Sequence, residues 1–466
     1  MTKTSRQDEH RIVAFLANPR RALWKLSWPI LGGMALMTLY SLVDMMFVGW
    51  VGSDAVAALA FNMPLVFLGM GITMGLATGA TAAVAQAIGA KEKTKADNTA
   101  EHAVVLGFVL GLTIATFGLT FGSHILTVLG AKGAIHTLAW SYFKVICWGM
   151  PFSMISAFFR GVLAGEGDTL RPMIVTSFGV GLNMILDPLL IFGLNLGVRG
   201  AAYATVISQL FVFSLFIYLI FHRRVTFLQF QLRSFRFHPT ILAAIFRIGF
   251  PASLSFVFMS AGQAVYNRIL SDYSQYAVAA YQIAGRVEMV YFMPIMAIAA
   301  SAVTLAGMFY GAGEYMRLRE IIRYTMKWGV LIGLTAAALV YPFAPIVMQI
   351  FKPSDEILAY GVTYLRIMAL VFPLVPIGMI SGRVMQGLGK GMPFMILSFL
   401  RVIAVGTPLA VVFSNVWHKP IEWVWFAMIS GSLAATVVGV IWLSITLRRA
   451  ERLPGPGAAI GAEAVA

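Results

Sequence analysis

Two aspartates stand inside long apolar stretches of this sequence, where a charged side chain is costly. Asp44 follows a run, residues 26–43, that contains no charged residue, and Asp187 lies in the apolar segment NMILDPLLIFG. An aspartate near the centre of a membrane-spanning helix costs roughly 2.5 to 3.5 kcal/mol on insertion scales. A bound proton or cation neutralises that charge, so both carboxylates are candidates for reversible ion binding.

Oxygen-bearing side chains accompany these acids at helical spacing. The pairs that stand four residues apart are Tyr40 with Asp44, Asn183 with Asp187, and Thr205 with Gln209. Residues four apart project from one face of a helix. Carboxylate, amide and hydroxyl oxygens are hard ligands that suit sodium, and they can also hydrogen-bond a protonated carboxyl group. The alternative is structural, with each acid reaching the membrane interface or tying helices together by hydrogen bonds.

The composition indicates that these elements are membrane-spanning helices. Hydrophobic residues make up 59% of the 466 residues and charged residues only 11%, whereas soluble globular proteins carry about 25% charged residues. Apolar runs of about 18 residues or more recur, and each can cross a bilayer. Because the runs do not alternate between apolar and polar residues, we predict an all-α polytopic membrane protein with roughly twelve helices. The expected spans are 22–48, 57–88, 98–122, 135–160, 170–192, 198–222, 241–270, 278–310, 322–350, 357–386, 392–414 and 421–448.

Basic residues fall in alternate loops between these spans. The basic set includes Lys91, Lys93, Lys95, Arg171, Arg223, Arg224, Arg233, Arg236, Arg317, Arg319, Arg323, Lys390, Arg448, Arg449 and Arg452, together with Arg20 and Arg21 near the N-terminus. The positive-inside rule places this set in the cytoplasm, so we expect both termini on the cytoplasmic side of the cell inner (plasma) membrane. Topology accounts for the net charge of +15, and no nucleic-acid partner is expected.

The two halves of the chain repeat each other at an offset of 222 residues. The tetrapeptide AVAA occurs at residues 55–58 and again at 277–280, and Pro29, Tyr142 and Gly165 map to Pro251, Tyr364 and Gly387. Six spans in each half predict two six-helix lobes related by a pseudo-two-fold axis along the membrane normal, as alternating access requires. The expected segments are a cytoplasmic N-terminal segment 1–21, a first lobe 22–222, a basic cytoplasmic linker 223–240, a second lobe 241–450 and a flexible tail 451–466.

Four stretches, in this order and spacing, resemble the multidrug and toxic compound extrusion (MATE) family. They are WPILGGMALMTLYSLVDMMFVGWVG (28–52), RGVLAGEGDTLRPM (160–173), NMILDPLLIFG (183–193) and GVRGAAYATVISQ (197–209). The resemblance implies two lobes around a V-shaped cavity. It also implies a secondary active multidrug exporter, not an enzyme, that antiports organic cations against protons or sodium ions and needs no cofactor beyond the coupling ion.

The resemblance is closest to the DinF-like branch, which places its ion site on acids of helices 1 and 5 with an Asn and a Thr. The corresponding residues here are Asp44, Asn183, Asp187 and Thr205, which would bind a proton or Na+. Tyr40 and Gln209 are expected to support them.

Pro29 stands within the first expected helix, where a proline removes a hydrogen bond. It can act as a moving hinge, produce a static bend, or occupy the first turn of the helix. The resemblance implies that the first helix bends, with Pro29 as its hinge. NorM-like members carry acids in helices 7 and 10, which residues 254–270 and 357–386 lack here. Glu288 is the main buried-acid candidate of the second half, and we include it as a supporting residue.

The residues that line a substrate cavity are the least defined. Methionine and aromatic side chains suit varied organic cations, and the candidates are Phe61, Asn62, Met63, Tyr266 and Gln282.

We expect a functional monomer. The alternative function is a lipid-linked precursor flippase of related architecture, which predicts a cavity rich in basic residues, whereas these spans contain few. An intramembrane enzyme predicts an HExxH or GxSxG motif, which the sequence lacks. A receptor or scaffold predicts no ion-dependent flux.

Overall fold

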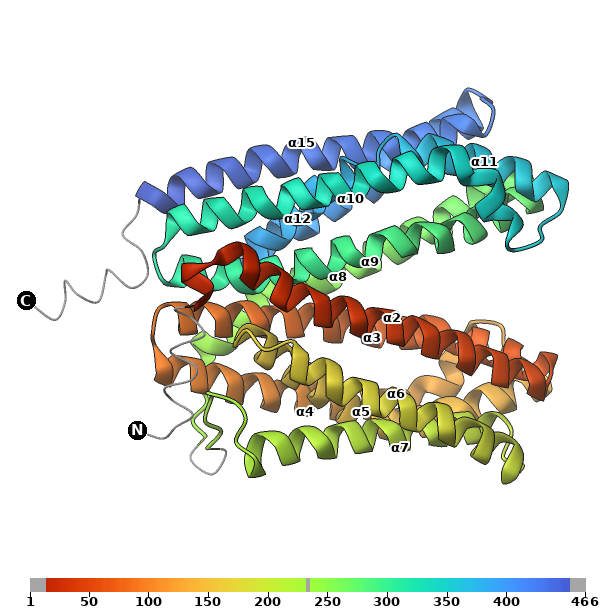
Figure 1. Ribbon diagram of the computed structural model, residues 1–466. Coiled ribbons are helices and arrows are strands. Elements are labelled where there is room, and N and C mark those ends of the chain that lie inside the picture. Colours follow the sequence, from red (N-terminus) through yellow and green to blue (C-terminus); the bar gives the residue numbers. More distant parts are fainter. Residues whose placement is uncertain (1–13, 232–234, 453–466) are drawn as a thin grey trace, which may run out of the picture.

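The computed structural model describes residues 14–231 and 235–452, which fold almost entirely into helices (Figure 1). The first lobe comprises α2 (Pro19–Val51), α3 (Ser53–Gly89), α4 (Lys93–Val128), α5 (Gly133–Gly165), α6 (Leu170–Pro188) and α7 (Val198–Ile217). The second lobe comprises α8 (Pro239–Tyr273), α9 (Gln275–Gly311), α10 (Tyr315–Gln349), α11 (Asp355–Ala369), α12 (Val375–Gly387), α13 (Met392–Phe399), α14 (Thr407–Val411) and α15 (Glu422–Arg452). Four π-helical turns interrupt or extend these helices: η1 (Leu189–Gly193), η2 (Tyr218–His222), η4 (Leu400–Gly406) and η5 (Val412–Val416).

Eleven helical segments of the described chain are long and apolar enough to cross a membrane. Most of their bounds lie within a few residues of the expected spans, so the prediction of an all-α polytopic membrane protein is confirmed. The expected span 357–386 is wrong as a single helix, because it divides into α11 and α12. Residues 370–374 form turns between them, and Pro373 within those turns has no backbone N–H to continue a helix.

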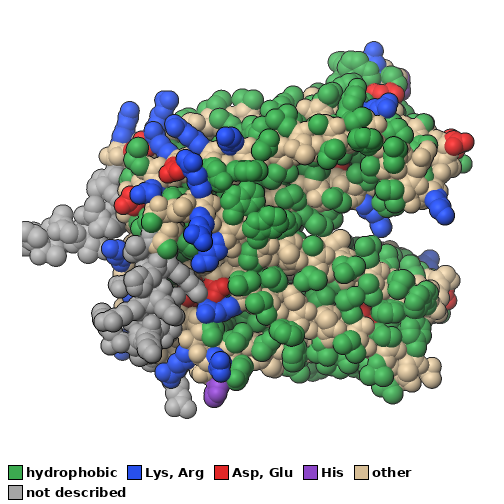
Figure 2. Space-filling view, viewed as in Figure 1, with side chains coloured by type: hydrophobic (Ala, Val, Ile, Leu, Met, Phe, Trp, Pro, Cys, Tyr) green, Lys and Arg blue, Asp and Glu red, His purple; other side chains and the backbone are tan. Residues whose placement is uncertain are grey.

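Apolar side chains cover most of the visible face in Figure 2, and Lys and Arg side chains gather at one end of it. We call this the basic end. Its exposed cations include Lys91, Arg223, Arg224, Arg448 and Arg449. A wide apolar belt with charged groups at its ends is the surface expected for a protein that crosses a bilayer.

The two lobes meet through helix α3, in the half of that helix that leads to the basic end. An added Cβ atom at Gly79 would lie 2.3 Å from the carbonyl oxygen of Ile245, and one at Gly89 would lie 2.0 Å from that of Met308. Only glycine permits such close approach between helix backbones. Toward the opposite end the lobes diverge, and a cleft separates them there in Figure 2.

The linker between the lobes is held against the first lobe by carboxylates. Glu166 accepts the backbone N–H of Phe227 at 2.7 Å and the hydroxyl group of Thr226. Glu101 likewise accepts the backbone N–H of Gln231 at 2.6 Å. Hydrogen bonds to ionised groups are stronger than neutral ones, so the described part of the linker is fixed to the first lobe.

The expected terminal segments fall largely outside the described residues. Of the segment 1–21, residues 1–13 are not described, and α2 already begins at Pro19. The side chain of Asn18 caps that helix by accepting the N–H of Arg21 at 3.1 Å. The expected tail 451–466 lies outside the described residues from position 453 onward, because α15 continues to Arg452.

Candidate functional site

The polar residues predicted from spacing come from three helices of the first lobe, α2, α6 and α7, which pack on one another. We call these residues, with Ser208, the first-lobe polar cluster; its members are Tyr40, Asp44, Asn183, Asp187, Thr205, Ser208 and Gln209. Helix α6 supplies its most buried pair and then widens into the π-helical turn η1 directly after Pro188. Such π-turns are frequent at functional sites.

Asn183 and Asp187 lie in the interior of the first lobe. Their side chains are 3% and 0% exposed, respectively. Neither the amide nitrogen and oxygen of Asn183 nor the two carboxylate oxygens of Asp187 find a hydrogen-bond partner among the described residues. A buried polar group without a partner is costly, and a buried unpaired carboxylate is far more so. These four atoms are therefore candidates for binding a proton or a small cation.

Helix α7, which packs against α6, carries further oxygen-bearing side chains. Ser208 is 5% exposed, and neither its hydroxyl oxygen nor the Gln209 side-chain oxygen has a hydrogen-bond partner among the described residues. An added Cβ atom at Gly149 of α5 would lie 2.5 Å from that Gln209 oxygen, so the absence of a side chain there makes room for it. The Thr205 hydroxyl differs, because it donates to the carbonyl oxygen of Ala201 at 3.0 Å.

Asp44 is half-buried on α2 and completes the cluster from the opposite side. It lies close enough to Asp187 for the two carboxylates to interact electrostatically. Tyr40 interacts with both acids, and its side chain approaches that of Thr205. The structure thus brings Tyr40, Asp44, Asp187 and Thr205 within range of one another. Asn183 stands one helical turn before Asp187 on α6, and Gln209 faces Gly149 of α5.

Sequence reasoning missed Tyr142 and Ser208. Tyr142, on α5, lies within electrostatic range of both Asp44 and Asp187. The repeat offers a signal for it, because its equivalent Tyr364 lies beside Glu288 in the second lobe. For Ser208, the signal is its position between Thr205 and Gln209 on one helix.

Glu288 lies in the second lobe, as the sequence predicts, and its supporting role stays a prediction. It lies on α9 of the second lobe, where Tyr364 of α11 and Arg401 of η4 are its polar neighbours. Its Oε1 atom has no hydrogen-bond partner among the described residues. The second lobe therefore holds a separate buried acid with its own surroundings.

The predicted cavity residues divide between interior and surface. Asn62 is 1% exposed and donates to the carbonyl oxygens of Ala58 and Ala139 at 3.1 and 3.0 Å, so it lies in the interior of the first lobe. Its place in a substrate cavity stays a prediction. Tyr266 is 6% exposed and is packed within the second lobe.

Phe61 packs against an apolar cluster of the first lobe. Met63 and Gln282 are exposed, and Gln282 donates to the Asn267 side chain at 3.0 Å. Phe61 is partly exposed, and the assignment of these three residues to a substrate cavity stays a prediction.

Pro29 is buried within α2, and the helix continues through it. Its ring nitrogen has no hydrogen to donate to the carbonyl oxygen four residues earlier, so one helical hydrogen bond is missing there. Pro251, its equivalent in the repeat, is likewise buried within α8.

The MatE family model matches this chain twice, at residues 29–189 and 251–412. The two matches begin 222 residues apart (251 − 29 = 222), which is the offset of the internal repeat. They account for most of both lobes.

Relatives and solved structures agree with this match. The chain is 28% identical over 407 residues to the "Probable multidrug resistance protein YoeA" of Bacillus subtilis, covering 85% of this chain and 87% of YoeA. It is 26% identical over 424 residues to the "Multidrug export protein MepA" of Staphylococcus aureus, covering 90% of this chain and 93% of MepA. A solved structure described as MATE in the bent conformation superposes with a TM-score of 0.90 at 31% identity, covering 97% of this chain and 99% of that one. The chain therefore belongs to the MatE family of membrane transporters and is not an enzyme.

Proposed function

We propose that this protein is a secondary active multidrug exporter of the DinF-like branch, which exchanges organic cations for protons or sodium ions by alternating access. The names of its relatives support the export of drugs, since YoeA is named a multidrug resistance protein and MepA a multidrug export protein. The observation that carries the coupling is the buried pair Asn183 and Asp187, whose polar side-chain atoms have no hydrogen-bond partner among the described residues.

Ion binding at the first-lobe polar cluster supplies the coupling. With both carboxylates ionised, Asp44 and Asp187 repel each other across an interior of low dielectric constant. A proton or Na+ relieves this repulsion and satisfies the orphaned oxygens. Because the ion contacts α2, α6 and α7 together, it stabilises the arrangement of these three helices in which the oxygens converge. An ion shifts a conformational equilibrium only by such a difference in affinity between states.

The basic end faces the cytoplasm of the cell inner membrane, and both termini lie on that side. This orientation follows from the excess of Lys and Arg in the loops there. In the state described here, the lobes are joined at the basic end and a cleft separates them at the other end. With this orientation, it is the state that releases substrate outside. Ion binding favours this state. Inward movement of the ion supplies about 2.3 kcal/mol per charge for each 100 mV of membrane potential.

Organic cations enter the cleft between the lobes, where exposed side chains such as Met63 and Gln282 contact them. Methionine adapts its shape to varied partners, which suits transport of many compounds. Each chain contains both lobes, the cleft and the ion site, so a monomer suffices for transport.

The test is export of a fluorescent organic cation from proteoliposomes, driven by an imposed proton gradient or an imposed sodium gradient. Asp187→Asn and Asp44→Asn should each abolish gradient-driven export while the protein still reconstitutes. Asp54→Asn is the matched control, because Asp54 is an exposed aspartate in the first turn of α3. Undiminished coupled export by Asp187→Asn would contradict the proposal.

A further inference from the structure

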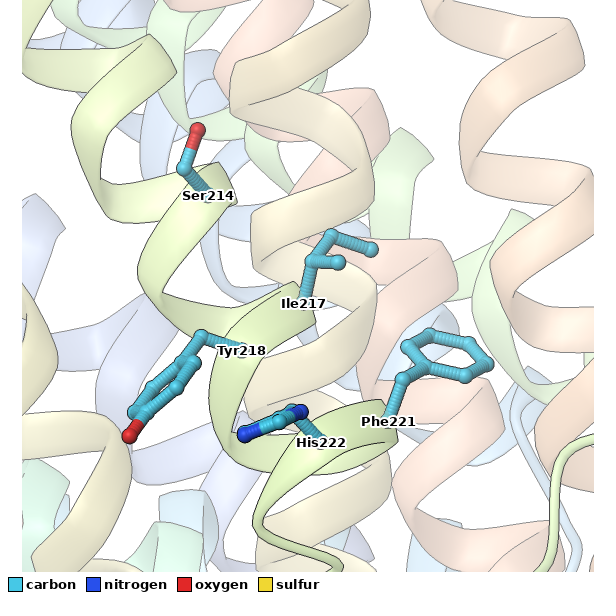
Figure 3. Close-up of a pocket in the computed structure, with 5 residues that line it drawn as sticks. All are labelled: Ser214, Ile217, Tyr218, Phe221 and His222. Atoms are coloured by element: carbon cyan, nitrogen blue, oxygen red, sulfur yellow. The ribbon is translucent and has the colours of Figure 1, made fainter.

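The outer face of α7 carries a groove where the helix approaches the basic end. Five residues of this helix and η2 line it, namely Ser214, Ile217, Tyr218, Phe221 and His222, so the groove is shallow and open and runs along a single helical segment (Figure 3). The figure shows the Tyr218 and His222 rings on one side and the Ile217 and Phe221 side chains on the other. The groove therefore has one aromatic, partly polar wall and one apolar wall.

A change in helical geometry makes this groove. The backbone N–H of Arg223 donates to the carbonyl oxygen of Tyr218, five residues earlier, at 2.9 Å. The wider turn brings the Tyr218 and His222 rings into a stack, with centroids 5.2 Å apart and planes at 24°.

The opposite face of the same helix is occupied by packing inside the lobe. Val212, Phe216 and Ile220 are buried there in an apolar cluster with Phe159 and Leu163 of α5. Ile217 and Phe221 also pack partly against this cluster, and the Phe221 ring contacts that of Phe230. The Tyr218 and His222 side of the groove is exposed. The candidate membrane span Val198–His222 ends at the groove, which places it where hydrocarbon gives way to lipid headgroups.

Positive charge follows directly at the polar end of the groove. Arg223 and Arg224 are both exposed, and Arg224 adopts a left-handed backbone conformation with φ 47°, which ends the helix. Arginine at a membrane interface attracts anionic lipid headgroups, and its planar group can donate two hydrogen bonds to one phosphate.

We propose that this groove binds one anionic phospholipid, with an acyl chain along Ile217 and Phe221 and the headgroup phosphate at His222, Arg223 and Arg224. The apolar wall and the adjoining charges match the two chemistries of such a lipid. A free phosphate would need only the charges. This inference is independent of the proposed exchange of ions for drugs, since no member of the first-lobe polar cluster takes part in it.

The experiment counts lipids retained by the purified full-length protein in native mass spectrometry, with phosphatidylglycerol or phosphatidylcholine added. Two variants act on different parts of the site. Arg223→Gln with Arg224→Gln removes its charge, and Ser214→Trp fills its apolar part at an exposed position without changing charge. The control is Arg448→Gln with Arg449→Gln, which removes the same charge from exposed positions at the same end of the molecule.

We expect the double arginine variant in the groove to bind phosphatidylglycerol about 30-fold more weakly, from roughly fivefold for each interfacial arginine. Ser214→Trp should also lose one bound phosphatidylglycerol, whereas the control pair should retain it. Added inorganic phosphate should not displace the lipid, and phosphatidylcholine binding should be unchanged. Equal losses in the control and groove pairs, full retention by Ser214→Trp, or displacement by phosphate would each overturn the proposal.

Discussion

The side chain of Gln86 in the first lobe donates a hydrogen bond from its Nε2 atom to the carbonyl oxygen of Gly387 in the second lobe, at 2.7 Å. Gln86 lies near the end of α3, and Gly387 is the last residue of α12. Gly387 itself approaches α9, because an added Cβ atom there would lie 2.6 Å from the carbonyl oxygen of Val303. The contacts that close the basic end therefore depend on backbone atoms exposed by glycine.

This dependence predicts that small substitutions at two glycines will separate the lobes. In Gly89→Ala the new methyl group would meet the Met308 carbonyl oxygen at 2.0 Å, and in Gly311→Ala that of Gln86 at 2.2 Å. Overpacking of this kind costs about 1–3 kcal/mol, enough to shift a balanced conformational equilibrium by roughly fivefold or more. We expect the population open at the basic end to increase.

Distances between spin labels at Lys91→Cys and Met316→Cys measure this opening, since both positions are exposed. The chain's single native cysteine, Cys147, is buried and will label poorly. Gly285→Ala is the matched control on α9, because no described atom lies within 4 Å of its added Cβ atom. An unchanged distance distribution in Gly89→Ala and Gly311→Ala would show that the glycine contacts do not hold the basic end closed.

The sequence predicted the helices well because hydropathy and loop charge are local properties. The expected span 198–222 coincides with the observed Val198–His222, since charged residues follow directly at its end. The span 357–386 failed, because an apolar pattern does not reveal that residues 370–374 leave the helix. Proline between apolar residues indicates either a kink or a break, and tertiary packing decides which.

The burial of the residues in the proposed ion site was predictable to a similar extent. Asn183 and Asp187 share one face of α6 by spacing alone, and their burial follows from the apolar surroundings. Tyr142 was missed because its approach to the acids depends on how α5 packs against α2 and α6, which spacing within one helix does not determine. The neighbours of Glu288, Tyr364 and Arg401, could not be predicted for the same reason, since they come from other helical elements of the second lobe.

Lys390 gives the protein a predictable dependence of stability on pH. This residue lies in the loop between α12 and α13, where burial, with Arg449 and Arg247 nearby, holds the pKa of its ammonium group below the ordinary 10.5. The folded state then binds this proton more weakly than the unfolded state, so stability rises with pH between the lowered pKa and 10.5. Lys390→Gln should stabilise the protein near neutral pH. It should also remove the contribution of this residue to the increase of stability with pH.

Thermal unfolding of the purified protein at a series of pH values up to 10.5 measures the effect. The matched control is Lys132→Gln, which removes an exposed lysine just before α5. The explanation fails if Lys390→Gln leaves the unfolding temperature near neutral pH unchanged, or if both variants change its pH dependence equally.

Pro29 is predicted to act as the hinge of α2 during transport. Pro29→Ala restores a backbone donor and removes a steric clash, changes worth about 3 kcal/mol in a helix interior. The bent form of α2 should become less populated and turnover should fall. Pro251→Ala is the matched control, because Pro251 is also buried inside a long helix but lies in the other lobe. Initial export rates in proteoliposomes compare the two variants, and unaltered turnover in Pro29→Ala would indicate a static bend.

Tyr142 is predicted to tune the affinity of the ion site through its hydroxyl group. Tyr142 and Tyr364 are equivalent in the repeat, yet the first lies near Asp44 and Asp187 and the second near Glu288. Tyr142→Phe retains the ring and removes a polar group worth about 1 kcal/mol, so the ion concentration for half-maximal export should rise roughly fivefold. Tyr364→Phe makes the same chemical change in the second lobe and should leave this concentration unaltered. Equal shifts in the two variants would mean that ion affinity is not set within the first lobe. A shift confined to Tyr142→Phe would tie ion affinity to that lobe, because the two substitutions differ only in which buried acids they face.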